Sequence, residues 1–452
     1  MTSAFAPDSR AARTLDLLVE LVRAACVNDL TPESGHEERA AAILERFFDG
    51  APVDLTRIEP APGRTTLVVS LEGTDPDAEP LTLLGHTDVV PADAAHWSRD
   101  PFGGEVAGGA VHGRGVVDML HLTASMAVVV RDLAVSVRRP KGRLVFIAEA
   151  DEEARGGLGV PWIGEHMPDA VPWDNCLSEM GGAHIHGADG SDAIVVVVGE
   201  KGCAQRRIRF TGDPGHGSVP YGRRSALENL VEGARRIAGA NLPVSRSDLW
   251  AAFVAAFGFA PEVAEPLIAG DESADCSAFG PLAAYAHAIS RLTIAQTAAR
   301  AGGPINVLPS SASLDLDIRT LPGQDDDAVD AVLRRALGDL APVASIERLL
   351  CEEATESPTT TRLYAAIERT LVAQHPGSAV LPVLFPGGTD LRVARRLGGV
   401  GYGFGSCASE RTLDAVYAQM HAHDESLPLD DLALTVDALA TLVDDFLGDE
   451  TS

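Results

Sequence analysis

Lysine is nearly absent from this chain. Lys141 and Lys201 are its two lysines, and arginine supplies the rest of the 36 basic residues, which face 65 acidic ones. The resulting net charge of −29 would repel phosphate backbones and anionic lipid headgroups. We therefore expect neither a nucleic acid nor a membrane surface among the partners of this protein.

Long apolar runs and closely paired cysteines are also missing. No stretch approaches the roughly 20 uninterrupted apolar residues of a membrane helix. The beginning of the sequence lacks the basic and then apolar order of a signal peptide; instead Leu15, Leu18, Val19 and Val22 predict an amphipathic helix. The six cysteines form no CxxC pair, which favours reduced thiols. We expect a cytoplasmic protein.

The remaining composition is that of a folded protein. The chain has 452 residues, of which 46% are hydrophobic and 22% are charged. These fractions exclude disordered and fibrous classes, and at about 150 residues per domain the length predicts two or three domains.

The first 200 residues alternate between strand-like and helical segments. Four short β-branched runs, at 65–73, 81–90, 143–153 and 193–200, are apolar almost throughout. Such runs are typical of strands buried on both faces, and the amphipathic stretches between them suit covering helices. The pattern predicts an α/β domain with a mostly parallel sheet, in which functional groups gather at the carboxyl ends of the strands.

The pattern changes after residue 200. Strands near 206–212 and 313–322 and helices near 225–240 and 325–340 predict an α+β unit. An Ala-rich stretch at 246–295 is expected to be a helical insertion. Beyond residue 355 the α/β pattern returns. We therefore predict a discontinuous first domain at 1–200 and 355–452, interrupted by a second domain at 201–354.

Polar residues follow several of the predicted buried strands. His86 and Asp88 alternate so that both point to the same side, and Asp118 follows a glycine-rich turn. Further acids end the later strands, and a histidine lies near the C-terminus: Asp151, Glu152, Glu153, Glu179 and His421. So many buried acids need cations to neutralise them. Imidazoles and carboxylates without thiolates suit zinc, manganese or cobalt.

The order of the motifs resembles that of the binuclear metallopeptidases of the M20 class, which includes glutamate carboxypeptidase, aminoacylase-1, carnosinase-like dipeptidases and succinyl-diaminopimelate desuccinylase. The resemblance covers most of the chain. It rests on eight motifs in one order: GHTDVVP (85–91), WSRDPFGGEV…VHGRGVVDM (97–119), EADEEARGG (149–157), SEMGG (178–182), GDPGHGSVP (212–220), INVLP…DIRTLPG (305–323), GGTD (387–390) and HAHDE (421–425).

The resemblance implies a zinc-peptidase-like catalytic domain that holds two divalent metal ions, zinc or alternatively cobalt or manganese. His86 and Glu179 would bind one ion, Glu153 and His421 the other, and Asp118 would bridge the two. The family spacing selects His421 rather than His423 as the ligand.

The resemblance also implies the catalytic roles. Asp88 would fix the tautomer of His86. Glu152 would be the general base. It would take a proton from the water held between the two metals, which becomes hydroxide, and would pass that proton to the leaving nitrogen.

The domain at 201–354 resembles the ferredoxin-like lid of the family, through which members form homodimers. His216 would reach the active site of the neighbouring subunit and stabilise the oxyanion. Asn306 and Arg319 would bind a substrate carboxylate, since the guanidinium fork suits it. Gly388 and Thr389 would line the same pocket.

The resemblance implies hydrolysis of an amide bond in a small peptide or an N-acyl amino acid with a free carboxylate. The sequence does not separate a carboxypeptidase, a dipeptidase and an aminoacylase. Two alternatives are a non-catalytic relative and a hydrolase of carbamoyl or amidino C–N bonds. After Asp118 the family usually continues with Lys and Gly in the places of Leu120 and His121, and we interpret this departure as a divergent substrate.

Overall fold

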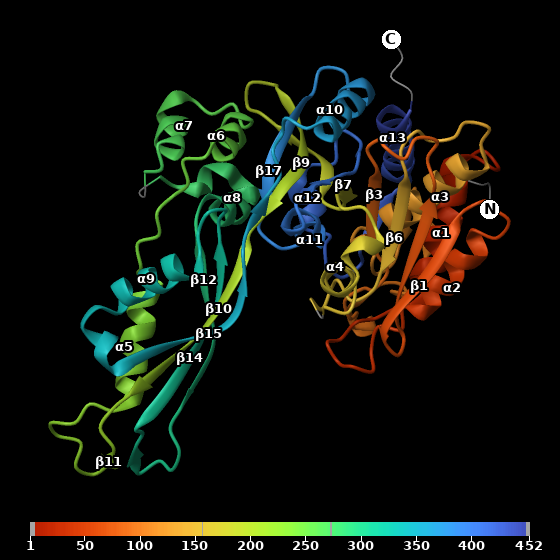
Figure 1. Cartoon of the computed structure of the whole chain (residues 1–452). Coiled ribbons are helices and arrows are strands. Elements are labelled where there is room, and N and C mark those ends of the chain that lie inside the picture. The colour runs from red at the N-terminus through yellow and green to blue at the C-terminus, as the bar shows by residue number, and fades with distance from the viewer. Residues whose placement is uncertain (1–4, 156, 272–273, 449–452) are drawn as a thin grey trace.

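The computed structural model describes residues 5–155, 157–271 and 274–448 and has two lobes (Figure 1). One lobe contains helices α1 (Arg10–Ala24) and α13 (Leu429–Leu447), near the two ends of the chain. The other lobe is elongated and contains a four-stranded sheet. Among the described helices, none combines the length and the apolar character that a membrane span requires.

The first lobe is built on a six-stranded mixed sheet. Four adjacent strands are parallel and two antiparallel strands extend one edge. This arrangement confirms the predicted α/β class with a mostly parallel sheet. The spatial order of the strands is β1 (Asp54–Ala61), β2 (Arg64–Leu71), β6 (Leu144–Glu149), β3 (Leu81–His86), β7 (Asn175–Ser178) and β18 (Val400–Gly403).

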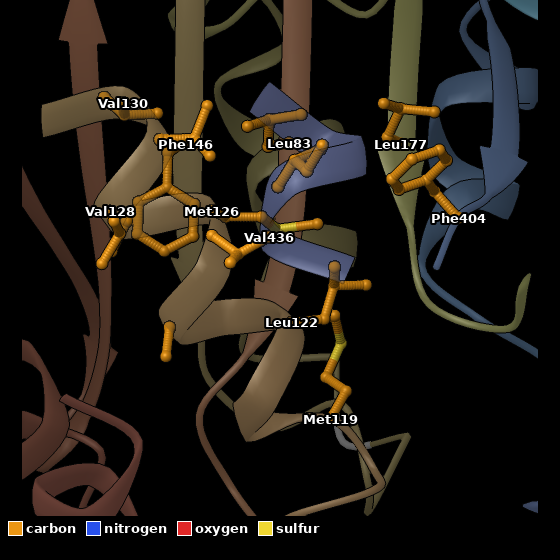
Figure 2. Packing of buried hydrophobic residues seen from close by; sticks show 14 of the residues in the cluster. Leu83, Met119, Leu122, Met126, Val128, Val130, Phe146, Leu177, Phe404 and Val436 are labelled. Carbon is orange, nitrogen blue, oxygen red and sulfur yellow. The ribbon is translucent and has the colours of Figure 1, made fainter. Parts of the chain in front are cut away.

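Helix α3 (Leu120–Val135) is the central helix of this lobe. Most of its side chains are buried because it packs against the sheet and also against α1 and α13. Figure 2 shows Met126 of α3 in the same apolar layer as Phe146 of β6 and Val436 of α13. This core fixes the N-terminal end of α3, which directly follows Asp118.

A second sheet lies beside the first. Its strand β9 (Asp192–Glu200) pairs in parallel with β17 (Ala379–Phe385), and with β8 (Gly181–His186) and β16 (Thr355–Glu356) in antiparallel fashion. Because β17 and β18 come from the C-terminal part of the chain, distant segments complete both sheets.

The Ala-rich segment is helical, as its composition predicts, but it ends before residue 295 because strand β12 begins at Thr293. Its apolar side chains share a core cluster with β9 and β17. The described helices of the 246–295 segment therefore pack on the second sheet and not on the sheet of the elongated lobe. They are α6 (Asp248–Ala255), α7 (Pro261–Ile268), η3 (Cys276–Leu282) and α8 (Ala283–Ser290).

The elongated lobe has an antiparallel sheet in the order β12 (Thr293–Ala301), β14 (Ser311–Thr320), β10 (Gly202–Thr211) and β15 (Ala344–Glu352). Helices α5 (Ala226–Ala238) and α9 (Asp326–Leu337) pack on it. The short ribbon of β11 (Gly215–His216) and β13 (Val307–Leu308) forms the far end of the lobe (Figure 1).

The short helix η4 (Gly338–Val343) contacts α9 and β15 in the elongated lobe. The remaining elements surround the first two sheets. They are α2 (Glu38–Phe47), η1 (Ala94–His96), β4 (Glu105–Ala107), β5 (Ala110–His112), α4 (Val160–His166), η2 (Pro168–Ala170), α10 (Arg362–Gln374), α11 (Leu391–Arg396), α12 (Leu413–Tyr417) and β19 (Ser426–Pro428).

Candidate metal centre

The predicted metal ligands come from neighbouring elements of the first lobe. His86 is the last residue of β3, Glu153 follows β6 in a turn, and Glu179 directly follows β7. Since β6, β3 and β7 are parallel neighbours, their carboxyl ends meet at one edge of the sheet. Asp118 reaches this edge from the start of α3, and His421 reaches it from the loop between α12 and β19.

Asp118 lies between the two imidazoles. Its Oδ1 is 3.2 Å from His86 Nε2, and its Oδ2 is 3.4 Å from His421 Nε2. Glu179 Oε2 lies 3.9 Å from His86 Nε2, and Glu153 Oε2 lies 3.1 Å from His421 Nε2. The structure thus brings the five predicted ligands together, with one carboxylate oxygen of Asp118 toward each half of the cluster. We call these residues the metal cluster: His86, Asp118, Glu153, Glu179 and His421.

The cluster fits divalent cations. Oε1 of Glu153 and Oε2 of Glu179 are buried without a hydrogen-bond partner, which is costly for carboxylates unless a cation pairs with them. Potential ligand atoms of His86, Asp118 and Glu153 lie within 4.8 Å of one another, as do those of His86, Glu152 and Glu179. Imidazole and carboxylate donors without thiolates match zinc, cobalt or manganese.

Burial and mutual contacts shift the titration of this cluster. Burial raises the pKa of Glu179 and of Glu152 well above the ordinary range. Burial would also raise the pKa of Asp118, but hydrogen bonds from His421 and His86 lower it well below its usual value. Hydrogen bonds to Asp118 and Glu153 raise the pKa of His421 to about 10. A bound cation would therefore displace protons from this cluster.

Asp88 supports two parts of the site. Its backbone carbonyl lies 2.9 Å from His86 Nδ1, whereas its carboxylate is 3.7 Å away. The carboxylate instead accepts hydrogen bonds from the backbone N–H groups of Glu152 at 3.2 Å and Glu153 at 3.1 Å. The acceptor for His86 is therefore the Asp88 carbonyl, and the Asp88 carboxylate holds the turn that carries Glu152 and Glu153.

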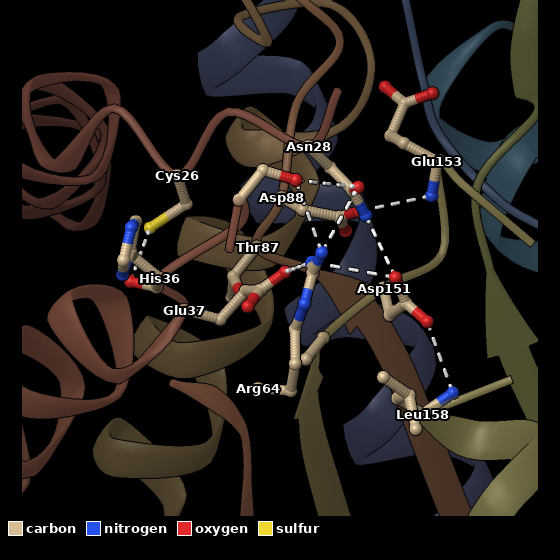
Figure 3. Close-up of polar contacts among 12 residues, drawn as sticks. Cys26, Asn28, His36, Glu37, Arg64, Thr87, Asp88, Asp151, Glu153 and Leu158 are labelled. Carbon is tan, nitrogen blue, oxygen red and sulfur yellow. Dashed lines mark hydrogen bonds and ion pairs between the residues drawn. The ribbon is translucent and has the colours of Figure 1, made fainter. Parts of the chain in front are cut away.

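A buried polar network lies behind this turn (Figure 3). Asn28 Nδ2 donates to Asp88 Oδ2 at 3.0 Å and to Asp151 Oδ1 at 2.9 Å. Arg64 donates to Glu37 at 2.8 Å and lies 3.4 Å from Asp151. Figure 3 shows the Glu153 carboxylate pointing away from the network while its backbone nitrogen is tied to Asp88. Sequence reasoning missed Asn28 and Arg64, since they lie far apart in segments without a distinctive motif.

Glu425 fixes the loop that presents Asp118. It is fully buried and accepts hydrogen bonds from the backbone N–H groups of Val117 at 2.7 Å and Gly115 at 3.1 Å. Arg114 pairs at 2.7 Å with Oε2 of Glu425, the oxygen that also accepts the Gly115 N–H. The HAHDE motif contained Glu425, but no role was predicted for it.

Three residues predicted to act on the substrate belong to the elongated lobe, and two of them, His216 and Asn306, lie in the ribbon at its far end. His216 is exposed in the β11–β13 ribbon, where its Nδ1 lies 2.7 Å from the hydroxyl of Ser218. The carbonyl of Asn306 accepts a hydrogen bond from the Gly217 N–H at 2.7 Å in the same ribbon. Arg319 pairs with Asp317 at 2.8 Å. Their roles toward a substrate remain predictions.

Gly388 and Thr389 precede helix α11. Thr389 is buried, and its hydroxyl donates to Glu200 at 3.0 Å. Arg392, which sequence reasoning missed, is buried nearby and pairs with Asp390 at 2.9 Å. Burial would lower the pKa of Arg392, but the carboxylates around it, including that of Glu152, raise it.

The other histidines near the motifs lie outside the metal cluster. The ring of His423 lies tilted against that of His96, with ring centroids 5.2 Å apart. His184 lies 2.9 Å from Asp192, and His186 lies 3.2 Å from the same carboxylate. His121 is half-buried at the start of α3, and burial lowers its pKa to about 4.

Comparison with known sequences gives a family match over most of the chain. The model of peptidase family M20/M25/M40 matches residues 82–445. Probable carboxypeptidase S-like 2 from Dictyostelium discoideum is 26% identical over 355 residues, which cover 72% of this chain and 64% of that protein. Human aminoacylase-1 is 25% identical over 393 residues, which cover 86% of this chain and 85% of that protein.

Solved structures of the same family share the fold. The metallo-carboxypeptidase Sso-CP2 from Sulfolobus solfataricus matches with a TM-score of 0.72 and 16% identity over 96% of this chain and 99% of that one. A dinuclear metal-binding peptidase of the M20 family from Bacillus subtilis matches with a TM-score of 0.61 and 15% identity over 97% of this chain and 98% of that one. At these identities, the likeness concerns the fold alone.

Proposed function

This chain belongs to peptidase family M20/M25/M40 and is an M20-type hydrolase, and we propose that it hydrolyses the amide bond of a small peptide or an N-acyl amino acid with a free carboxylate. The position of Asp118 between the imidazoles of His86 and His421 carries this proposal. A single carboxylate that faces two imidazoles, each with a further acid beside it, is suited to a pair of cations.

The metal cluster would hold two divalent ions, with His86 and Glu179 on one side, Glu153 and His421 on the other, and Asp118 between them. Two such ions would lower the pKa of a water toward neutrality and polarise the scissile carbonyl. Zinc is the ion we favour, and cobalt and manganese suit the same donors.

Glu152 would act as the general base. Burial raises its pKa, which would offset the lowering of that pKa by two nearby cations. Its carboxylate would then accept a proton from the attacking water and deliver it to the leaving nitrogen. This delivery is needed because an amide nitrogen does not leave as an anion. The Asp88 carboxylate holds the Glu152 N–H at 3.2 Å and so fixes the backbone from which the base projects.

The elongated lobe would serve as a lid and as the surface of a homodimer. His216 is exposed at its far end, where a side chain can reach a neighbouring subunit and stabilise the oxyanion there. Asn306 and Arg319 would bind the substrate carboxylate together with the loop of Gly388 and Thr389. For Arg319 this requires an exchange of its Asp317 partner for the substrate.

Paired substrates test the proposal. Zinc- or cobalt-loaded protein is incubated with dipeptides and N-acyl amino acids, each beside its C-terminal amide. We expect cleavage of the free acids and at least tenfold slower cleavage of the amides. Equal cleavage of both would contradict carboxylate recognition, and no cleavage of any compound by metal-loaded protein would contradict the proposed reaction.

A further inference from the structure

A largely apolar cavity of about 60 Å³, partly open to the outside, adjoins the metal cluster. Glu179 belongs to its lining, and so does Val117, the residue before Asp118. The cavity therefore lies directly beside Glu179 and next to the loop that carries Asp118. Its apolar walls come from β8, β9, β17, α8 and the α12 region: Ala183, Val195, Val197, Tyr285, Phe385 and Tyr417.

The aromatic wall of this cavity is fixed in place. The Tyr285 hydroxyl donates to the Leu384 carbonyl at 2.8 Å, and its ring meets Tyr417 edge to face, with centroids 5.2 Å apart. Because its hydroxyl is already used, Tyr285 offers the cavity its ring. Tyr285 belongs to the Ala-rich helical segment, so this segment supplies part of the wall beside the metal cluster.

Each charged residue of the described lining belongs either to the metal cluster or to an ion pair. Arg411 lies 3.6 Å from the buried carboxylate of Asp431, which also accepts the Ala408 N–H at 2.8 Å. His121 is neutral at ordinary pH because burial lowers its pKa. Among the described lining residues, the carboxylates are Glu179, a member of the metal cluster, and Asp431, the partner of Arg411. A ligand with a free ammonium group finds no uncommitted acid here.

We propose that this cavity is an acyl pocket that receives the uncharged apolar acyl group of an N-acyl amino acid. The scissile carbonyl would then lie at the metal cluster, beside Glu179. A free dipeptide would place its α-ammonium at the mouth of an apolar pocket without a partner, and such a group is costly to bury. This inference rests on the proposed function and selects an acylase reaction within it.

Two polar side chains in the lining refine this proposal. Nδ1 of His121 and Nε and Nη2 of Arg411 are buried without hydrogen-bond partners. Both residues line the pocket, so a water or an uncharged oxygen at the end of the acyl group can be accommodated there. His121 stands where the family usually has glycine, so its imidazole adds a wall to the pocket that a glycine would not supply.

The first test uses the wild-type, zinc-loaded enzyme and two kinds of matched substrate. One is a pair, leucyl-alanine and 4-methylpentanoyl-alanine, which differ by the amino group alone. The other is a series of acetyl-, butanoyl- and hexanoyl-alanine. We expect at least a tenfold higher kcat/KM for the deamino compound. We also expect a rise of about fourfold for each buried methylene until the pocket is full.

The second test changes the pocket. Ala183→Leu fills it and should lower kcat/KM for hexanoyl-alanine at least tenfold, while acetyl-alanine stays within threefold of wild type. Val197→Ala enlarges it and should shift the preference toward longer chains. Val196→Ala is the matched control, because Val196 faces the other core cluster and does not line the pocket. Melting curves verify that each variant folds.

Binding of the substrate is measured separately, in a variant that does not hydrolyse it. Calorimetric binding of hexanoyl-alanine to zinc-loaded Glu152→Gln protein should weaken at least fivefold when Ala183→Leu is added. Wild-type hydrolysis that is equal for all chain lengths, or faster for leucyl-alanine, would overturn the acyl pocket while leaving the proposed hydrolase intact. Absence of hydrolysis for every compound would instead overturn the proposed function.

Discussion

Asp88 shows how one residue supports catalysis without touching the substrate. Its carbonyl faces His86 Nδ1, and its carboxylate holds the turn of Glu152 and Glu153. The alternation of His86 and Asp88 predicted that both point to the same side, and the family resemblance implied that Asp88 fixes the tautomer of His86. The sequence did not predict that the Asp88 carbonyl faces His86 while the Asp88 carboxylate holds the turn, since the position of the carboxylate depends on Asn28, a residue from a distant segment.

Asn28 offers a test of this support at the residue scale. In Asn28→Ala the carboxylates of Asp88 and Asp151 lose their shared donor, so the turn of Glu153 loosens. We expect zinc affinity to fall by roughly 10- to 100-fold, the usual cost of disturbing residues behind metal ligands. Competition with a chromogenic chelator measures this.

The matched control for Asn28→Ala is Asn229→Ala. Asn229 is also buried, but it donates to the Thr211 carbonyl in the elongated lobe. Zinc affinity should be unchanged in the control. An unchanged affinity in Asn28→Ala as well would contradict a role of the network in holding the metal cluster.

His121 predicts a pH dependence. Burial lowers its pKa to about 4, whereas histidine in an unfolded chain titrates near 6.5. Between these values the unfolded chain binds more protons, so this residue makes stability rise with pH and fall as the pH drops from about 6.5 toward 4. Metal-free wild type should lose about 2 °C or more of Tm over this interval beyond the loss in His121→Gln. Parallel losses in calorimetric scans would refute a buried neutral His121.

At the scale of elements, the sequence patterns predicted the type and order of the helices and strands better than the residues at which they begin and end. The apolar run 81–90 indicated a strand that ends at His86 in the structure, because the backbone must turn there to present the imidazole. The run 65–73 indicated a buried strand, yet β2 pairs antiparallel at the edge of the parallel group. Strand direction depends on pairing partners, which periodicity alone does not specify.

Helix α9 and strand β10 are joined by a buried ion pair. Arg206 is fully buried and donates to Asp330 at 2.9 Å and to Asp326. Asp330 also pairs with Arg348 at 2.8 Å, so its charge stays compensated in Arg206→Ala. The loss of two hydrogen bonds to carboxylates and of a buried side chain should still lower the free energy of unfolding by about 3 kcal/mol. Urea denaturation measures the change. Arg209 also belongs to β10, and Arg209→Ala removes its exposed pair with Glu347 of β15. This variant should lower the free energy of unfolding by at most about 1 kcal/mol.

At the scale of the whole molecule, the two lobes separate the predicted site residues. The five predicted metal ligands converge in one lobe, whereas His216 and Asn306 lie at the far end of the other (Figure 1). Motif order could indicate that both sets belong to one active site. Which subunit supplies each set depends on assembly, which a single sequence does not encode in any local pattern.

Mixing of variants tests the predicted exchange between subunits. Glu152→Gln lacks the base, and His216→Ala lacks the oxyanion donor, so each homodimer should be nearly inactive. In a mixed dimer, one site combines an intact Glu152 with His216 of the partner. Refolding the two variants together should therefore restore roughly a quarter of wild-type activity. No recovery, with mixed dimers verified by differential tags, would contradict action in trans.

Glu152 is the residue on which the account depends most, because it lies within ligand distance of His86 and Glu179 and yet is assigned as the base. The decisive measurement determines zinc content and hydrolysis of the best N-acyl substrate together for wild type, Glu152→Gln and Glu153→Gln. We expect Glu152→Gln to retain the zinc of wild type while kcat falls about 10³-fold, and Glu153→Gln to lose zinc. Loss of zinc from Glu152→Gln, or hydrolysis at the wild-type rate, would contradict the assignment.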